Sequence, residues 1–180
     1  MKGSPLKSNP EFMTVEENRI ITISYELREG DISGHVMEVM SMAYPFIFFY
    51  KSGGILDSFQ EQLRGLENGS PFEFTLSAEE AYGQRTDEQI AEVPIERFVV
   101  DDEMADSIRD VGEYVAITDD EGKTQNGKVI QKTATHVKVD LNHAMAGKQL
   151  HFKGRILSVR KATADEIIQK RYIMPDGIRF

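Results

Sequence analysis

The sequence predicts an α+β fold in which an antiparallel sheet wraps on one short helix, beside a small β-rich unit. Three observations predict this class. Several short segments alternate apolar and polar residues or are rich in β-branched ones, as strands are. One stretch has apolar residues at helical spacing, and the composition becomes acidic after Gly83 before strand-like segments return.

Six segments have the composition of strands. Residues 20–27 are rich in β-branched side chains, and residues 72–76 alternate between apolar and polar side chains. The other four segments are residues 114–117, 128–131, 136–140 and 148–159. An Asp-Glu-Gly turn and the hairpin signal Asn126-Gly127 are predicted to separate the first two strands of the small unit.

One helix is predicted from five apolar residues at helical spacing: Ile55, Leu56, Phe59, Leu63 and Leu66. It is expected to end before Gly69. A second, shorter helical pattern begins after Thr163, a typical N-cap residue. Residues 35–50 hold an unusual density of methionine and aromatic side chains, and no helix or strand is assigned to them.

Composition and charge exclude several classes of protein. The 180 residues contain 21 Lys and Arg and 30 Asp and Glu, which gives a formal charge of −9. Because the sequence also has no run of basic residues that could follow a phosphate backbone, nucleic-acid binding is not expected. The absence of cysteine removes disulfide scaffolds, thiolate zinc sites and thiol nucleophiles. No stretch approaches the ~18 apolar residues that span a bilayer, and no secretory signal is recognisable. We expect a soluble, cytoplasmic protein with no membrane partner.

The first twelve residues are set apart from the rest. Residues 1–12 have no periodicity, and their Gly-Ser and Glu-Phe pairs are what cloning linkers commonly encode. We expect a vector-derived tag, and a native unstructured arm is the alternative.

Common catalytic motifs are missing. No Gly-x-Ser-x-Gly elbow and no phosphate-binding glycine loop occurs, so hydrolysis and nucleotide chemistry have no predicted site. The four histidines, His35, His136, His143 and His151, lack the spacing of a helical zinc pair. We expect no metal and no cofactor.

Aromatic residues are the remaining candidates for a site. Tyr25, Phe46, Phe48, Phe59 and Tyr82 could form an ordinary core or line an apolar pocket. Tyr82 favours the pocket, because it stands between Ala and Gly at the start of a polar loop, where a ring without a ligand would be exposed.

Several motifs in order resemble one family. They are Pro45-Phe46-Ile47-Phe48, Ile55-Leu56 with Phe59, Glu79-Glu80-Ala81-Tyr82-Gly83, and the segment Asn142-His143-Ala144-Met145-Ala146-Gly147 that continues to Phe152. They are similar to the SlyD-like branch of the FKBP-type peptidyl-prolyl isomerases, over about residues 20–162. The resemblance implies catalysis of X-Pro bond rotation in unfolded or partly folded proteins, together with chaperone activity.

In that branch a chaperone domain interrupts a loop of the isomerase domain. The resemblance therefore implies a discontinuous isomerase domain at 13–84 and 145–162, an inserted chaperone domain at 85–144 and a C-terminal tail at 163–180. The tail has no His and no Cys, so the nickel-binding tail of many such proteins is not expected. A catalytically weak chaperone on the same fold is the alternative.

The resemblance also implies the residues of the site. The pocket would consist of Tyr25, Phe48, Ile55, Leu56, Phe59, Tyr82 and Phe152, with Phe46 at its edge. The Ile55 N–H and the Tyr82 hydroxyl would donate to substrate carbonyls. Glu38 stands where the family usually has Asp, and residues 51–58 depart from the usual loop, so slower catalysis than is typical is expected.

The inserted domain would hold the client chain. Its candidate client-binding residues are Val93, Ile95, Phe98, Val99, Val100, Val111, Tyr114 and Val115. Each of them could equally fill the core of so small a domain. The implied partners are unfolded or proline-containing polypeptides, and we expect a monomer.

Overall fold

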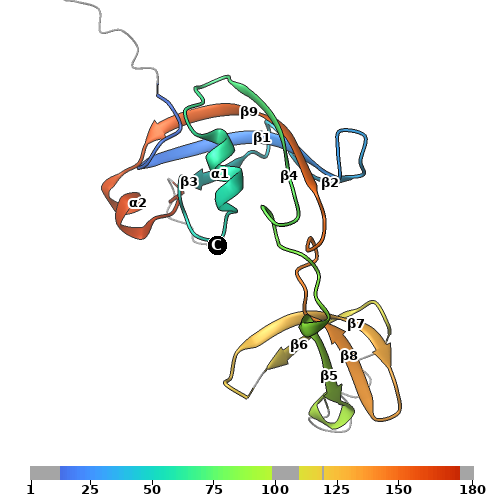
Figure 1. The fold of residues 1–180 in the computed structure, drawn as a ribbon. Helices are drawn as coiled ribbons and strands as arrows, with labels where there is room; N and C mark the ends of the chain where they lie inside the picture. The colour runs from blue at the N-terminus through green and yellow to red at the C-terminus, as the bar shows by residue number, and fades with distance from the viewer. Residues whose placement is uncertain (1–12, 99–109, 119, 175–180) are drawn as a thin grey trace, which may run out of the picture. The chain divides into compact units, whose positions relative to one another are not determined.

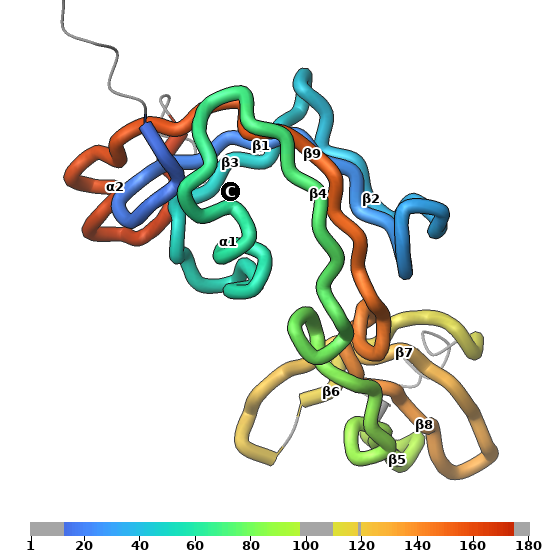
Figure 2. Tube along the Cα trace, turned by 45° about the horizontal axis from the view of Figure 1, so that its top comes forward, coloured from blue at the N-terminus to red at the C-terminus, as the bar shows by residue number. Residues whose placement is uncertain are grey.

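The chain folds into two compact units. The first consists of residues 1–81 and 148–180, and the second is the continuous segment 82–147. In this computed structural model the described residues are 13–98, 110–118 and 120–174, which Figures 1 and 2 trace in colour. The tag predicted at residues 1–12 lies outside the described residues. Residues 82–84 and 145–147, which the sequence assigned to the isomerase domain, belong to the second unit.

The first unit is an antiparallel five-stranded sheet with two short helices. Its strands are β1 (Arg19–Glu29), β2 (Val36–Met40), β3 (Phe46–Phe49), β4 (Pro71–Leu76) and β9 (Leu150–Lys161). The order is β2-β1-β9-β4, and β3 pairs with β1 as well. The predicted α+β fold, with an antiparallel sheet wrapped on a short helix, is confirmed (Figure 1).

Helix α1 (Asp57–Leu63) buries Phe59 and Leu63 against the sheet. It ends earlier than the predicted Leu66. Gly65 has φ +78°, a left-handed conformation that cannot continue the helix. The Leu66 carbonyl instead accepts a hydrogen bond from the Val15 N–H, at 2.8 Å, so the chain after the helix is tied to the N-terminal segment.

Residues 35–50, to which no element was assigned, supply two strands. β2 pairs with the second half of β1 through Tyr25↔Met40, and β3 pairs with the first half through Ile23↔Phe46. Both strands therefore use the same edge of β1, one after the other. The strands have five and four residues, too few to display an alternating pattern in a stretch that is largely apolar apart from residues such as Glu38.

The second unit is a four-stranded antiparallel sheet in the order β5-β8-β7-β6. Its elements are β5 (Ile90–Pro94), β6 (Tyr114–Thr118), β7 (Thr124–Lys132), β8 (His136–Asp140) and two 3₁₀ turns, η1 (Asp87–Gln89) and η2 (Ile95–Phe98). Val129, Val137 and Val139 form its buried cluster.

The hairpin predicted at Asn126-Gly127 is wrong, because both residues lie within β7. The chain turns at the Asp-Glu-Gly segment, where Gly122 has φ +83°. Gly127 is required by packing, since a Cβ there would lie 2.4 Å from Val139 Cγ1 and 2.7 Å from Leu141 Cδ2. A glycine in a strand can thus mark a close approach of a neighbour as well as a turn.

Helix α2 (Ala164–Gln169) follows Thr163, as predicted, with a capping box. The Glu166 carboxylate accepts from the Thr163 N–H at 2.9 Å and from both terminal nitrogens of Arg160, at 2.7 and 2.8 Å. Burial, which leaves the side chain 1% exposed, acts to raise the pKa of Glu166, but hydrogen bonds from Arg160 outweigh it and lower the pKa to about 2.

Among the described residues no helix is both long and apolar enough to cross a membrane.

The Glu166 ion pair predicts a loss of stability in acid. Because the folded-state pKa lies below the value of 4.5 for a free glutamate, the stabilisation is present above about pH 5 and is lost as the pH falls toward 2. Glu166→Gln is expected to cost about 2–3 kcal/mol of unfolding free energy at pH 7 and to flatten the dependence on pH between 5 and 2. Urea unfolding at several pH values measures both. Asp165→Asn, in the same turn but exposed, is the control; an unchanged slope in Glu166→Gln would contradict the prediction.

Candidate active site

Five aromatic side chains from four elements meet on the helix-covered face of the first unit. They are Tyr25 of β1, Phe46 and Phe48 of β3, Phe59 of α1 and Phe152 of β9, and we name them the aromatic cluster. The Phe59 ring is central: its centroid lies 4.8 Å from that of Phe152, 6.1 Å from Tyr25 and 6.5 Å from Phe48. Phe46 lies 5.2 Å from Phe48 and 6.2 Å from Tyr25.

Strand register brings these rings to one face. Side chains two residues apart share a face, so Ile21, Ile23 and Tyr25 point the same way along β1. β3 pairs Phe46 with Ile23 and Phe48 with Ile21, which places both phenylalanines beside that row. α1 then adds Phe59 from above the same face.

Burial divides the cluster into a floor and an edge. Phe48, Phe59 and Phe152 are 3–6% exposed, whereas Tyr25 and Phe46 are half-buried. The cluster therefore has a buried part, formed by Phe48, Phe59 and Phe152, and a partly exposed part, formed by Tyr25 and Phe46. A planar apolar ring of a ligand can stack against such a surface without losing hydrogen bonds.

Gly154 makes room for this cluster. It lies opposite Tyr25 on one side and Phe72 on the other. A Cβ at this position would be 2.2 Å from the Ser24 carbonyl oxygen, 2.6 Å from the Phe72 ring and 2.8 Å from Tyr25 Cβ. No side chain larger than hydrogen fits there without displacing both aromatic residues.

Glu38 lies at the edge of the cluster. The Tyr25 hydroxyl donates a hydrogen bond to its carboxylate. Both residues are half-buried, and Glu38 belongs to β2, the strand that pairs with the Tyr25 half of β1. The glutamate side chain, which is one methylene longer than the aspartate usual in the family, thus reaches the tyrosine hydroxyl.

Ile55 and Leu56 lie just before α1 and are half-buried. Their segment is held by Gln60, whose side chain is fully buried. The Gln60 amide donates to the Ile55 carbonyl at 3.1 Å and accepts from the Lys51 N–H at 2.5 Å. One buried side chain therefore fixes the loop that carries two predicted pocket residues.

Sequence reasoning missed two neighbours of the aromatic cluster. The Phe74 ring of β4 lies 5.5 Å from Phe152 and 5.7 Å from Phe59, and the Phe72 ring lies 6.5 Å from Phe59. Their alternation with Glu73 predicted a strand, but no local signal indicated that this strand borders the cluster.

Tyr82, the remaining predicted pocket residue, belongs to the second unit. Its side chain is 40% exposed, and its ring stacks on that of His143 with centroids 3.8 Å apart and planes within 2°. Gly83, which follows it, has φ +75° and accepts a hydrogen bond from the Gly147 N–H at 2.7 Å.

The predicted client-binding residues divide by burial. Ile95 and Val115 pack against the valine cluster of the second unit, and Val93 is 7% exposed. Val111 and Tyr114 are 63% and 62% exposed. Val99 and Val100 lie outside the described residues, and Phe98 ends the turn η2.

A buried carboxylate joins the segment that enters the second unit to the segment that leaves it. Asp140, 4% exposed, accepts hydrogen bonds from the Asn142 side chain at 2.6 Å and from Arg85. Burial acts to raise the pKa of Asp140, but the bonds from Asn142 and the charge of Arg85 outweigh it, and the pKa lies below its usual value. Asn142 also bonds both backbone groups of Thr86, at 3.0 and 3.1 Å, so the two ends of the unit are joined.

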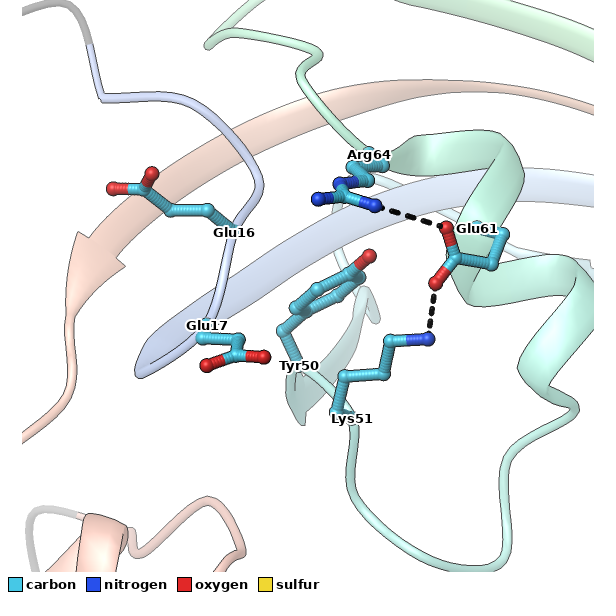
Figure 3. A pocket seen from close by; sticks show the side chains of 6 residues that line it. All are labelled: Glu16, Glu17, Tyr50, Lys51, Glu61 and Arg64. Atoms are coloured by element: carbon cyan, nitrogen blue, oxygen red, sulfur yellow. Dashed lines mark hydrogen bonds and ion pairs between the residues drawn. The ribbon is translucent and has the colours of Figure 1, made fainter.

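A separate cavity of about 410 Å³ has a polar lining (Figure 3). It is lined by Glu16, Glu17, Tyr50, Lys51, Glu61 and Arg64, none of which was predicted to belong to the pocket. Glu61 pairs with both Lys51 and Arg64, and burial raises the pKa of Tyr50. These charged walls do not suit an apolar ring.

Among the described residues no group of three or more His, Cys, Asp or Glu side chains could hold a metal ion.

A sheet wrapped on a short helix, with an aromatic cluster between them, defines an FKBP-type isomerase fold with a second unit inserted in it. No sequence-family profile matches the chain. It is 34% identical over 155 residues to the FKBP-type peptidyl-prolyl cis-trans isomerase SlyD of Aeromonas hydrophila, a match that covers 86% of this chain and 69% of the relative. The SlyD proteins of Haemophilus influenzae and Escherichia coli K12 are 30% and 28% identical, covering 77% and 75% of the relatives and 86% of this chain. The chain belongs to the SlyD-like FKBP-type peptidyl-prolyl cis-trans isomerases and is an enzyme of that class.

The close packing at Gly154 gives a test of the cluster's architecture. Gly154→Ala is expected to lower the unfolding free energy by about 1–3 kcal/mol, because the added methyl overpacks against Phe72 and Tyr25. Gly53→Ala is the matched control: a Cβ there meets nothing within 4 Å, and a change between zero and a gain of about 1 kcal/mol is expected. Urea unfolding measures both variants. Equal stabilities would contradict the tight packing at Gly154.

Proposed function

We propose that the aromatic cluster, with Ile55 and Leu56, is the site at which X-Pro bonds of polypeptide substrates rotate. The observation that carries the proposal is the burial pattern of the cluster. Its three nearly buried rings form a floor, and half-buried Tyr25 and Phe46 form an edge that a proline ring can reach. The pyrrolidine ring is apolar and compact enough to pack on such a floor.

Rotation needs no proton transfer and no covalent intermediate. The barrier of ~18–20 kcal/mol arises from amide resonance, which the twisted state loses. The twisted amide is less polar than the planar one, so replacing water by aromatic surface favours the transition state over the ground state. Each ~1.4 kcal/mol of that preference gives a tenfold increase in rate.

Polar groups at the edge of the cluster would orient the substrate chain. No described residue accepts a hydrogen bond from the Ile55 N–H, which is available to a substrate carbonyl, while Gln60 holds its loop. Tyr25 donates to Glu38, which fixes the Tyr25 ring at the edge. A donor to a substrate carbonyl at this edge would help to set the direction of the chain across the floor.

We propose further that the second unit binds unfolded segments of the substrate. Exposed Val111 and Tyr114 support this, since they lie within four residues of each other outside the valine cluster. Among the predicted client-binding residues whose side chains the structure describes, Val93, Ile95 and Val115 contribute to the core, and Val111 and Tyr114 are the exposed candidates. A client held on this unit would present its prolines at a raised local concentration to the isomerase unit.

Removing an aromatic ring from the edge tests the pocket. Phe46→Leu keeps an apolar side chain at a half-buried position, and we expect kcat/KM on a short X-Pro peptide to fall about five- to tenfold, equivalent to ~1–1.4 kcal/mol. Tyr172→Leu is the matched control, because that ring packs near Arg160 and not in the cluster. Unchanged activity in Phe46→Leu would contradict the assignment of Phe46 to the site.

The client-binding proposal has a separate test. Val111→Ser with Tyr114→Ser is expected to reduce suppression of client aggregation by half or more, and to leave kcat/KM on a short peptide unchanged, since a short peptide needs no tether. Ile168→Ser in α2, 77% exposed, removes an even more exposed apolar side chain from the first unit and serves as the control. Equal suppression by all variants would contradict client binding at Val111 and Tyr114. A chain that suppresses aggregation without accelerating a proline-limited refolding step would support a holdase instead.

A further inference from the structure

Tyr50 brings a buried hydroxyl to the charged cavity of the first unit (Figure 3). The residue is 2% exposed, and no described residue forms a hydrogen bond with its hydroxyl oxygen, which is itself buried. A buried hydroxyl without a partner lowers the stability of the fold, and a phenylalanine at the same place would not have this cost. The hydroxyl is therefore a group that a ligand of this cavity would satisfy.

One side of the cavity carries an excess of positive charge. The Glu61 carboxylate pairs with Lys51 and, at 3.7 Å, with Arg64, so that two cations share one anion. Figure 3 shows the Tyr50 hydroxyl pointing toward this group. The Arg64 side chain is 71% exposed and its contact with Glu61 is long, so it can move at little cost and uncover the hydroxyl. A ligand carboxylate placed there accepts from Tyr50 and lies beside two cations.

The other side of the cavity carries an excess of negative charge. Glu16 and Glu17 line it, across the Tyr50 ring from Glu61 (Figure 3). Glu16 pairs with Arg19, whereas Glu17 forms no ion pair with a described residue. Burial, together with the charges of Glu61 and Glu17, raises the pKa of Tyr50, so the hydroxyl stays protonated and can donate.

The space is larger than a single small ion requires. The cavity measures about 410 Å³, and an adjoining cavity of about 300 Å³ shares Glu17, Tyr50 and Lys51 with it. Phe49 and Ile167 also line the second cavity and give it an apolar part. A ligand with a charged group at each end and a short apolar part between them matches these walls.

We propose that this cavity binds small zwitterions that carry an ammonium and a carboxylate at opposite ends, the chemistry of free amino acids and dipeptides. The carboxylate accepts from the Tyr50 hydroxyl beside Arg64, and the ammonium pairs with Glu17. The cavity shares no residue with the aromatic cluster, so the inference goes beyond the proposed function and does not depend on it. It explains why a tyrosine occupies a buried position at which its hydroxyl has no partner in the described chain.

Three dipeptides separate the two charged groups of the ligand. Alanylalanine carries both, N-acetyl-alanylalanine lacks the ammonium, and alanylalanine amide lacks the carboxylate. Binding to the full chain is followed through the NMR shifts of the Lys51 and Arg64 backbone amides. We expect the amide to bind about tenfold more weakly than alanylalanine and the N-acetyl form about two- to fivefold more weakly, because Glu17 is exposed and the Tyr50 hydroxyl is buried. Alanine as a fourth probe distinguishes a free amino acid from a dipeptide as the preferred ligand.

Two variants test the two contacts. Tyr50→Phe is expected to weaken alanylalanine binding about tenfold and to leave binding of the amide unchanged. Glu17→Gln is expected to weaken it about two- to fivefold and to leave binding of the N-acetyl form unchanged. Tyr172→Phe and Glu79→Gln, which make the same changes outside both cavities, are the matched controls. Without ligand, Tyr50→Phe leaves the urea midpoint unchanged or raises it, because the hydroxyl that it removes has no partner.

Several results would overturn the inference. Equal binding of alanylalanine to Tyr50→Phe and to the unaltered chain would exclude the hydroxyl as a contact, and tighter binding of either blocked dipeptide would exclude a zwitterion site. A lowered urea midpoint in Tyr50→Phe would show that the hydroxyl has a structural partner. Competition of alanylalanine with a short X-Pro substrate, insensitive to Tyr50→Phe, would place the dipeptide in the aromatic cluster instead. Failure of the proposed isomerase site, seen as unchanged activity in Phe46→Leu, leaves these titrations unaffected.

Discussion

The pairing of β1 with β9 is the constraint on which the rest of the first unit depends. It runs through eleven residue pairs, from Arg19↔Lys161 to Glu29↔Leu150, and joins segments separated by more than a hundred residues. β1 carries Tyr25 and offers one edge to β2 and β3, while β9 carries Phe152 and offers its other edge to β4. The aromatic cluster exists because these two strands are in this register. Gly154 lies opposite Tyr25 in this register, and a Cβ at that position would clash with both neighbouring strands, so only glycine fits there.

A long insertion between β4 and β9 is compatible with this pairing for a physical reason. The entropic cost of closing a loop rises only by about 0.6 kcal/mol for each doubling of its length. The cost is smaller still when the insertion folds and its ends are joined, as the bonds of Asn142 to Thr86 and of Gly147 to Gly83 join them here. The entropic cost of pairing β4 with β9 is then similar to that of a short loop between them.

Much of the fold followed from the sequence, and the failures have local causes. Strand 136–140 was predicted with its observed bounds, and Thr163 was predicted as an N-cap, because alternation and capping are properties of neighbouring residues. β2 and β3 were missed because strands of only five and four residues, in a largely apolar stretch, are too short to display a clear alternation. The Asn126-Gly127 hairpin was wrong because the contact that requires Gly127 comes from Val139 and Leu141 of another segment. At the site, five predicted rings meet, but Phe74, Gly154 and Gln60 were not predicted, since their roles depend on cross-strand or buried polar contacts that the local sequence does not encode.

The inserted unit is closed by bonds between its own two ends. Asn142 bonds both backbone groups of Thr86 and donates to buried Asp140, which also accepts from Arg85. The Gly147 N–H donates to the Gly83 carbonyl. Because these bonds join residues of one unit, the insert is a self-contained element of the proposed mechanism: it binds clients through exposed Val111 and Tyr114, while the aromatic cluster of the first unit rotates their X-Pro bonds.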